Sequence, residues 1–155
     1  MDPARYLKEI VRPTLEEFER DPTSVRRAFI ACVVTFHTLD YLGGSRQKFG
    51  QACPEFATVD RVAHAFKHVE TGHPNNTLKP PLKALEIVSR PPAVAGLMAC
   101  GLSRVGDAIG GVTIWTDTTV DLTHVLRRAY AFLSAKVETE GWDGSSLQRI
   151  EQANS

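Results

Sequence analysis

The sequence predicts a mainly helical protein, a helical bundle of about four helices with a small β-hairpin or three-stranded patch before the C-terminal helix. Apolar residues recur every three or four positions over most of the chain, which is the spacing of an amphipathic helix. Asp-Pro pairs at 2–3 and 21–22 are typical helix starts. Residues 112–115 differ, because they are rich in β-branched and aromatic side chains that favour strands. The 155 residues fit a single domain.

Composition narrows the functional class. Hydrophobic residues make up 43% and charged residues 23%, as in an ordinary globular protein. Lysine plus arginine equals aspartate plus glutamate at 18 each, so only a local basic patch could attract nucleic acid. Cys32, Cys53 and Cys100 form no CxxC pair and predict neither a disulfide framework nor a cysteine zinc site. The N-terminus lacks a signal-peptide pattern, and the longest apolar run, 28–36, is too short for a membrane span. We therefore expect a cytoplasmic protein with no membrane partner.

The first helix is expected to begin with Asp2 as its cap and Pro3 at its first position. Pro13 should kink or break it. Thr14 and Glu17 form a capping-box pattern immediately afterwards, which predicts that the helix restarts there. The apolar stripe of this segment consists of Leu7, Val11, Leu15 and Phe18.

The second helix is predicted to start at Asp21-Pro22, to run to Tyr41 and to end at Gly43-Gly44. It is the most apolar helix of the chain, and such a helix is usually the one around which the others pack. We therefore expect its large apolar residues to be nearly inaccessible to solvent. These are Phe29, Val33 and Phe36.

The third helix is predicted from Pro54, over about 56–69, with one apolar side and one polar side. Residues 70–83 are rich in turn formers and predict an exposed loop. The apolar stripe consists of Val59, Val62, Phe66 and Val69. The polar side carries Asp60, Arg61, His64, Lys67 and His68.

The C-terminal part predicts short strands followed by a helix. Residues 85–88 are strand-like and are stopped by Pro91-Pro92. Gly110-Gly111 precedes the strand at 112–115, and 119–120 could form a second short strand. Asp121 is placed to cap the last helix, and the polar tail after Gly141 is expected to be frayed. The apolar stripe of that helix consists of Leu122, Val125, Leu126, Ala129, Phe132 and Leu133.

The polar side of the third helix is the first candidate for chemistry. Arg61 and Lys67 could hold a phosphate while a neighbouring histidine, His64 or His68, moves a proton. The alternative is that this polar side is only the solvated face that every amphipathic helix needs.

His37 and Asp40 are a second candidate, because residues three apart are neighbours on a helix surface. Since they lie in an apolar helix, we expect them to be buried and hydrogen-bonded across the bundle. They would form either a pair that fixes helix register or a site histidine oriented by an acid.

A metal site is the third candidate. His64 and His68 have a zinc-chelating spacing, and His37 and Asp40 could add ligands. Ala65 follows His64, so the glutamate of an HExxH arrangement is absent. We therefore expect neither a metal nor a cofactor.

Two segments support a resemblance to a known family. Residues 36–41, FHTLDY, and residues 65–68, AFKH, resemble small uncharacterised bacterial helical proteins, which are in turn similar to the HEPN superfamily. The superfamily motif is an arginine, four to six residues and a histidine. Arg61 and His68, with six residues between them, match it. The chain departs from the pattern at Val62, where active members commonly have a polar residue, and in the strand-rich stretch 85–120.

The resemblance implies a helical bundle that often dimerises and that, when active, cleaves RNA without a metal. The leading hypothesis is thus a HEPN-like RNA-binding or RNA-cleaving protein of a defence or toxin-antitoxin type. Arg61 would contact phosphate, His68 would act as acid-base, His64 and Lys67 would assist, and the His37–Asp40 pair would support the site. The alternative is a non-catalytic helical interaction module, antitoxin-like or an assembly partner. The third hypothesis is a metal-dependent enzyme using His37, His64 and His68.

Overall fold

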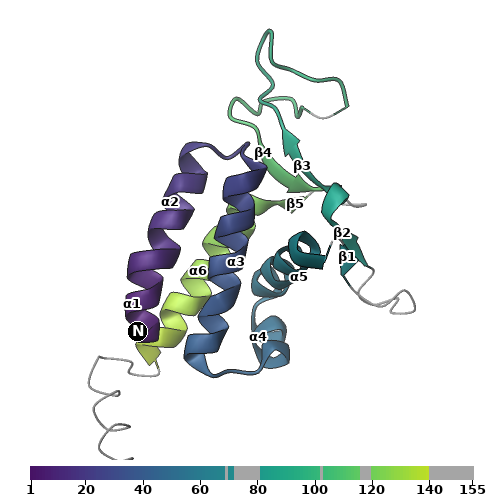
Figure 1. Ribbon diagram of the computed structural model, residues 1–155. Helices are drawn as coiled ribbons and strands as arrows, with labels where there is room; N and C mark the ends of the chain where they lie inside the picture. The colour runs from purple at the N-terminus through teal and green to yellow at the C-terminus, as the bar shows by residue number, and fades with distance from the viewer. Residues whose placement is uncertain (69, 72–80, 102, 116–119, 140–155) are drawn as a thin grey trace, which may run out of the picture.

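A computed structural model of the chain describes residues 1–68, 70–71, 81–101, 103–115 and 120–139. These residues form a helical bundle with a small sheet before the last helix, as predicted (Figure 1). The helices are α1 Pro3–Tyr6, α2 Arg12–Arg20, α3 Val25–Leu42, α4 Arg46–Ala52, α5 Pro54–His68 and α6 Leu122–Thr139. The strands are β1 Glu70–Thr71, β2 Leu82–Lys83, β3 Ile87–Arg90, β4 Gly111–Ile114 and β5 Val120–Asp121. No helix among the described residues is long and apolar enough to cross a membrane.

The N-terminal helical segment is continuous from Pro3 to Arg20, so of the predicted kink or break at Pro13 the break is wrong, and so is the restart after it. The Asp2 side chain accepts a hydrogen bond from the backbone N–H of Arg5 at 2.8 Å, as expected of the cap. A π turn, η1 (Leu7–Val11), precedes the proline, and such a widened turn lets a helix continue past a residue that lacks an N–H. Thr14 donates its hydroxyl to the carbonyl of Ile10 at 2.6 Å, so it does not cap a new helix.

Helix α3 begins three residues later than Pro22 suggests. Ser24 is its cap, with its hydroxyl accepting from the backbone N–H of Arg27 at 3.3 Å. Asp21 instead closes the preceding turn, because its carbonyl accepts from the N–H of Ser24 at 3.1 Å. The helix ends at Gly43, whose φ of 62° is the left-handed conformation predicted for this position.

The face of α3 that is buried in the bundle differs from the one expected. Phe29 is 37% exposed, and Val33 and Phe36 are only partly buried, so the prediction that these three are nearly inaccessible is wrong. The buried face is made of small residues, because α3 packs against α2, α5 and α6 at once and small side chains allow close approach. Its most buried members are Ala28, Ala31, Cys32, Thr35 and Thr38.

The other helices bury the stripes expected of them. Val59 and Val62 of α5 are fully buried, and Phe66 is half-buried. Helix α6 buries the predicted residues apart from Phe132, which is half-buried. Helix α4 was not predicted at all. Val69 and the tail after Gly141 lie outside the described residues.

The sheet is antiparallel, in the order β3-β4-β5, and β4 packs against α6 (Figure 1). Ile87 pairs with Ile114, and both are buried. The first of the predicted strands lies two residues later than expected, because Ala84–Glu86 form a 3-10 turn. A separate ladder, β1 with β2, pairs the two ends of the predicted 70–83 loop, of which residues 72–80 lie outside the description.

Candidate functional site

A buried carboxylate organises the polar side of α5. Asp60, with a side chain 13% exposed, has Oδ2 at 2.5 Å from Nε of Arg46 and Oδ1 at 3.0 Å from Nδ1 of His64. The hydrogen bond of Nδ1 is to the backbone carbonyl oxygen of Asp60, at 2.9 Å, whereas Oδ1 lies close to the ring without a hydrogen bond among the described residues. Two oxygens around Nδ1 favour the tautomer in which this nitrogen carries the proton, which leaves Nε2 as an acceptor. Asp60 therefore orients His64 as a proton acceptor.

Aromatic packing fixes the His64 ring from the other side. The ring of Phe36 meets it edge-on, with centroids 5.0 Å apart at 87°. The guanidinium of Arg46 lies 5.7 Å from the centroid of the same Phe36 ring. Since the His64 side chain is 26% exposed, its ring is held on two sides and remains open to solvent.

The other predicted site residues follow α5 on either side of His64. His68 is exposed, and its ring is roughly parallel to that of His64, with centroids 6.1 Å apart. Arg61 is partly buried and Lys67 is exposed. Arg61 and His68 lie seven residues apart, which places them on one side of the helix but separates them by about 10 Å along its axis. His64 lies between them and is the centre of the cluster.

His37 and Asp40 pair with each other, but not as predicted. Nδ1 of His37 lies 2.7 Å from Oδ2 of Asp40, whereas the two side chains are 51% and 68% exposed. The expectation that they are buried and bonded across the bundle is therefore wrong. This end of α3 turns toward solvent because the small-residue face is the one that packs. The pair is a surface pair, of the kind that contributes little to stability.

A shallow apolar pocket of about 200 Å³ lies between α3 and α5, next to His64. Phe29, Val33 and Phe36 of α3 form one wall. Ala63, His64 and Lys67 of α5 form the other, and His37 lies at the margin. The aromatic residues that fail to enter the core therefore line a surface pocket beside the oriented histidine.

The described residues form neither a metal site nor an activated thiol at Cys32 or Cys53. Within the described ranges, no three histidine, cysteine, aspartate or glutamate side chains gather in a way that could hold a metal ion. His37, His64 and His68 therefore do not converge as the third hypothesis requires. Burial raises the pKa of the thiols of Cys32 and Cys53, so both stay protonated and are poor nucleophiles.

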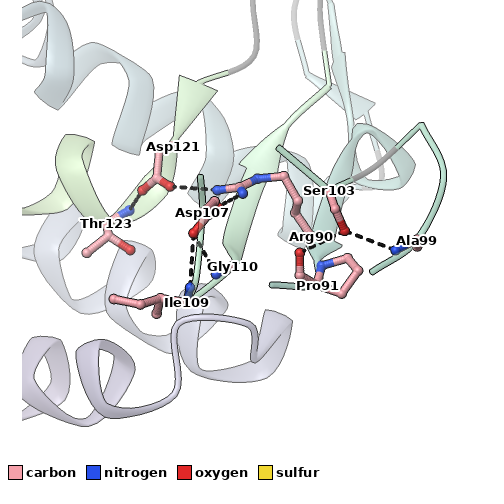
Figure 2. A network of polar contacts seen from close by, with 9 residues as sticks. All are labelled: Arg90, Pro91, Ala99, Ser103, Asp107, Ile109, Gly110, Asp121 and Thr123. Atoms are coloured by element: carbon pink, nitrogen blue, oxygen red, sulfur yellow. Dashed lines mark hydrogen bonds and ion pairs between the residues drawn. The ribbon is translucent and has the colours of Figure 1, made fainter. Parts of the chain in front are cut away.

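A second polar cluster lies at the sheet (Figure 2). Arg90, at the end of β3 and 3% exposed, forms ion pairs with Asp107 and Asp121, the latter at 3.3 Å. Oδ1 of Asp107 accepts from the N–H of Gly110 at 2.9 Å. Gly110 has a φ of 77°, and a Cβ there would lie 2.5 Å from the carbonyl oxygen of Arg90. The cluster fixes the loop between β3 and β4, residues 91–110.

The surface beside this cluster is balanced in charge. A hollow of about 540 Å³ is lined by both cations and carboxylates. Arg90 faces two aspartates, and Nε of Arg127 lies 2.6 Å from a carboxylate oxygen of Glu19. Because the charges already match one another, the cluster acts as an anchor of the fold.

The β3–β4 loop extends away from the helices (Figure 1), and several of its apolar side chains are exposed. Leu97 is 61% exposed, Met98 66% and Ile109 68%, and Val105 is fully exposed. The N–H of Ala93 donates to the carbonyl of Asp107 at 2.6 Å and closes the base of the loop.

Sequence reasoning predicted His64 as a site residue, placed Asp60 only on the polar side of the same helix, and missed their partners. Arg46 was missed because α4 was not predicted. Ser45 before it could have signalled a helix start, although its side chain makes no cap hydrogen bond. Arg90 gave no local signal, since its partners lie 17 and 31 positions away in the chain.

Comparison with known proteins gives no assignment: no family model, no curated protein and no solved structure matches this chain.

Proposed function

We propose that this protein binds RNA and cleaves it without a metal ion, as the resemblance to the HEPN superfamily implies. One observation carries the proposal. Asp60 and Phe36 hold His64 with one ring nitrogen available, and the His68 ring lies 6.1 Å away. Two neighbouring histidines can accept a proton from one oxygen and donate a proton to another, which is what metal-independent RNA cleavage requires.

The reaction would proceed by transfer within the RNA chain. Nε2 of His64 takes the proton from a 2′-hydroxyl, and the 2′-oxygen attacks the adjacent phosphorus. The bond from phosphorus to the 5′-oxygen breaks as His68, in its protonated form, gives that oxygen a proton. The products are a 2′,3′-cyclic phosphate and a free 5′-hydroxyl, so atoms and charges balance.

Cations on the same helix would stabilise the charge that develops on the phosphate. Arg61 and Lys67 lie on either side of His64 in sequence, and Lys67 is exposed. An arginine or lysine placed at a developing negative charge lowers the barrier most where water is partly excluded.

The test incubates the purified protein with labelled RNA in excess chelator. Wild type should cleave, and His64→Ala and His68→Ala should each lower the rate by roughly 10²–10⁴-fold, the usual contribution of an acid-base group. Arg61→Ala should also lower the rate, because it removes a charge that stabilises the phosphate. The double variant of Arg61 and His68 should lose little more than the more damaging single one, because residues that act on one transition state fail together. DNA of the same sequence should remain intact, because it lacks the 2′-hydroxyl.

Two matched control variants show whether cleavage comes from this protein or from a contaminating nuclease. His124→Ala removes an exposed histidine at the start of α6, and Arg12→Ala removes an exposed arginine of α2. Both should cleave as wild type does, and all variants should give the same circular dichroism spectrum. Equal activity in every variant, or no cleavage of any RNA by wild type, would contradict the proposal.

The exposed apolar β3–β4 loop supports the second candidate, a non-catalytic interaction module. Apolar side chains that extend from a rigidly anchored loop are typical of a surface that contacts a protein partner. In that case α5 presents only a solvated face, and the His68→Ala variant would behave as wild type in every assay.

A further inference from the structure

The pocket between α3 and α5 has the size and lining of a seat for a single flat ring. Its volume of about 200 Å³ lies below the ~300–1,000 Å³ of pockets that hold drug-sized ligands. Phe29, Val33 and Phe36 supply an apolar and aromatic wall, and the small side chain of Ala63 leaves the opposite side open. Aromatic walls of this kind stack the bases of single-stranded nucleic acid, since every base has a flat apolar face.

The rim of the pocket carries positive charge. Lys67 is exposed and makes no ion pair with any residue in the described part of the chain. Asp60, the nearest carboxylate on α5, is already paired with Arg46. A ligand with an apolar ring and a negative group at its edge, such as a nucleotide unit, complements this arrangement.

The pocket also shares a wall with the proposed reaction site. His64 is one of the residues that line the pocket, and it is oriented by Asp60 through Nδ1. A base held against Phe29 and Phe36 would therefore bring its own sugar and phosphate close to His64 and Lys67. A base can enter such a pocket only when it is unstacked and unpaired.

We infer that this pocket seats one unstacked base of single-stranded RNA next to the phosphate to be cleaved. The inference rests on the proposed function for its substrate, and it adds that paired RNA is excluded. A second copy of the chain fits less well, because a stable interface buries about 800 Å² per partner and this pocket offers only a fraction of that area.

The test measures binding separately from cleavage. A 2′-O-methyl RNA oligonucleotide cannot be cut, and a 2-aminopurine base within it reports stacking by its fluorescence. Wild type should quench this fluorescence and bind the single strand. The duplex and an oligonucleotide with one abasic position should bind more weakly. Phe29→Leu should weaken single-strand binding roughly 5- to 150-fold, which corresponds to the loss of one base–aromatic stack.

Trp115→Leu is the matched control, since it removes an exposed aromatic residue immediately after β4. It should bind as wild type does. Equal binding by Phe29→Leu and wild type, or equal binding of single strand and duplex, would overturn the inference. So would a change in oligomeric state as the only effect of Phe29→Leu, because the pocket would then be an interface between copies.

The two proposals fail in distinguishable ways. Unchanged cleavage by Phe29→Leu would contradict the inference that the pocket binds a base, and it would not contradict the proposed nuclease activity. If the protein cleaves no RNA and Phe29→Leu still weakens binding, the inference about the pocket would hold and the proposed nuclease activity would be contradicted.

Discussion

At the scale of single residues, Asp60 is a charged group held in a largely shielded position. Its carboxylate is largely shielded from water, with Oδ2 paired to the guanidinium of Arg46 and Oδ1 close to Nδ1 of His64. A buried charge is tolerated only when it is paired in this way. The contact restricts the rotation of the His64 ring and determines which of its nitrogens faces solvent.

Asp60→Asn provides a test of this orientation. The amide keeps the shape of the side chain but loses the charge that favours a proton on Nδ1, so kcat for RNA cleavage should fall with little change in KM. The loss should be smaller than the 10²–10⁴-fold expected for a proton-transfer group itself. Steady-state kinetics measure the split. A rise in KM with kcat unchanged would mean that Asp60 serves only to bind RNA.

The residues of this site could be predicted only in part. Helical spacing alone places Asp60, His64 and Lys67 on one side of a helix. It does not place Arg46 against Asp60 or Phe36 against His64, because those contacts depend on how α3 and α4 pack on α5. The same limit explains why His37 and Asp40 were expected inside. Their apolar neighbours in sequence do not decide which way α3 faces.

At the scale of elements, α3 shows that the central helix of a bundle need not bury its largest side chains. Neighbours on several sides require close approach, and Ala28, Ala31 and Thr35 permit it. The aromatic residues of α3 are displaced to the margin, where Phe29 meets Phe66 of α5 edge-on with centroids 5.2 Å apart. A prediction from hydrophobicity alone places Phe rather than Ala in the core, and it therefore chooses the wrong face of α3.

A comparison of two phenylalanines tests this assignment. Phe56 of α5 is fully buried, with its ring against those of Phe49 and Phe132, so Phe56→Ala should lower the free energy of unfolding by about 3–5 kcal/mol. Phe29→Ala should cost less than half as much, since Phe29 is 37% exposed. Urea denaturation measures both. Equal losses would place Phe29 in the core after all.

The predicted helix ends agree with the structure where a single residue determines the end. Asp2, Gly43 and Asp121 act as predicted because a cap depends on its own side chain or on its own backbone conformation. The helix does not break at Pro13 because a π turn precedes it. Whether such a turn forms depends on the packing of the whole segment, which the residues around Pro13 do not reveal. Helix α4 was missed because its seven residues carry too weak a stripe to stand out.

At the scale of the whole molecule, the β3–β4 loop extends away from the bundle (Figure 1). The base of the loop is closed between Ala93 and Asp107, and its tip exposes apolar side chains. Replacing residues 94–106 with Asn-Gly, a two-residue hairpin connection, should therefore leave the fold intact. The circular dichroism spectrum and the RNA cleavage rate should match those of wild type. Loss of cooperative thermal unfolding would show that the loop is part of the core.

The same variant separates the two candidate functions. A nuclease centred on His64 does not need the loop, whereas an interaction module would lose its exposed apolar surface. A full cleavage rate in the shortened protein would therefore assign the catalytic role to the helices alone.

The Asp121 carboxylate links these two parts of the molecule thermodynamically. One oxygen accepts from the backbone N–H of Thr123, at 2.8 Å, and caps α6, while the other lies against Arg90 at the base of the loop. Any event that draws Arg90 away changes the charge balance on the carboxylate that holds the first turn of α6. Fraying of that turn and release of the loop are therefore coupled equilibria. Amide exchange at Thr123 would report on a loop that precedes it by more than a dozen residues.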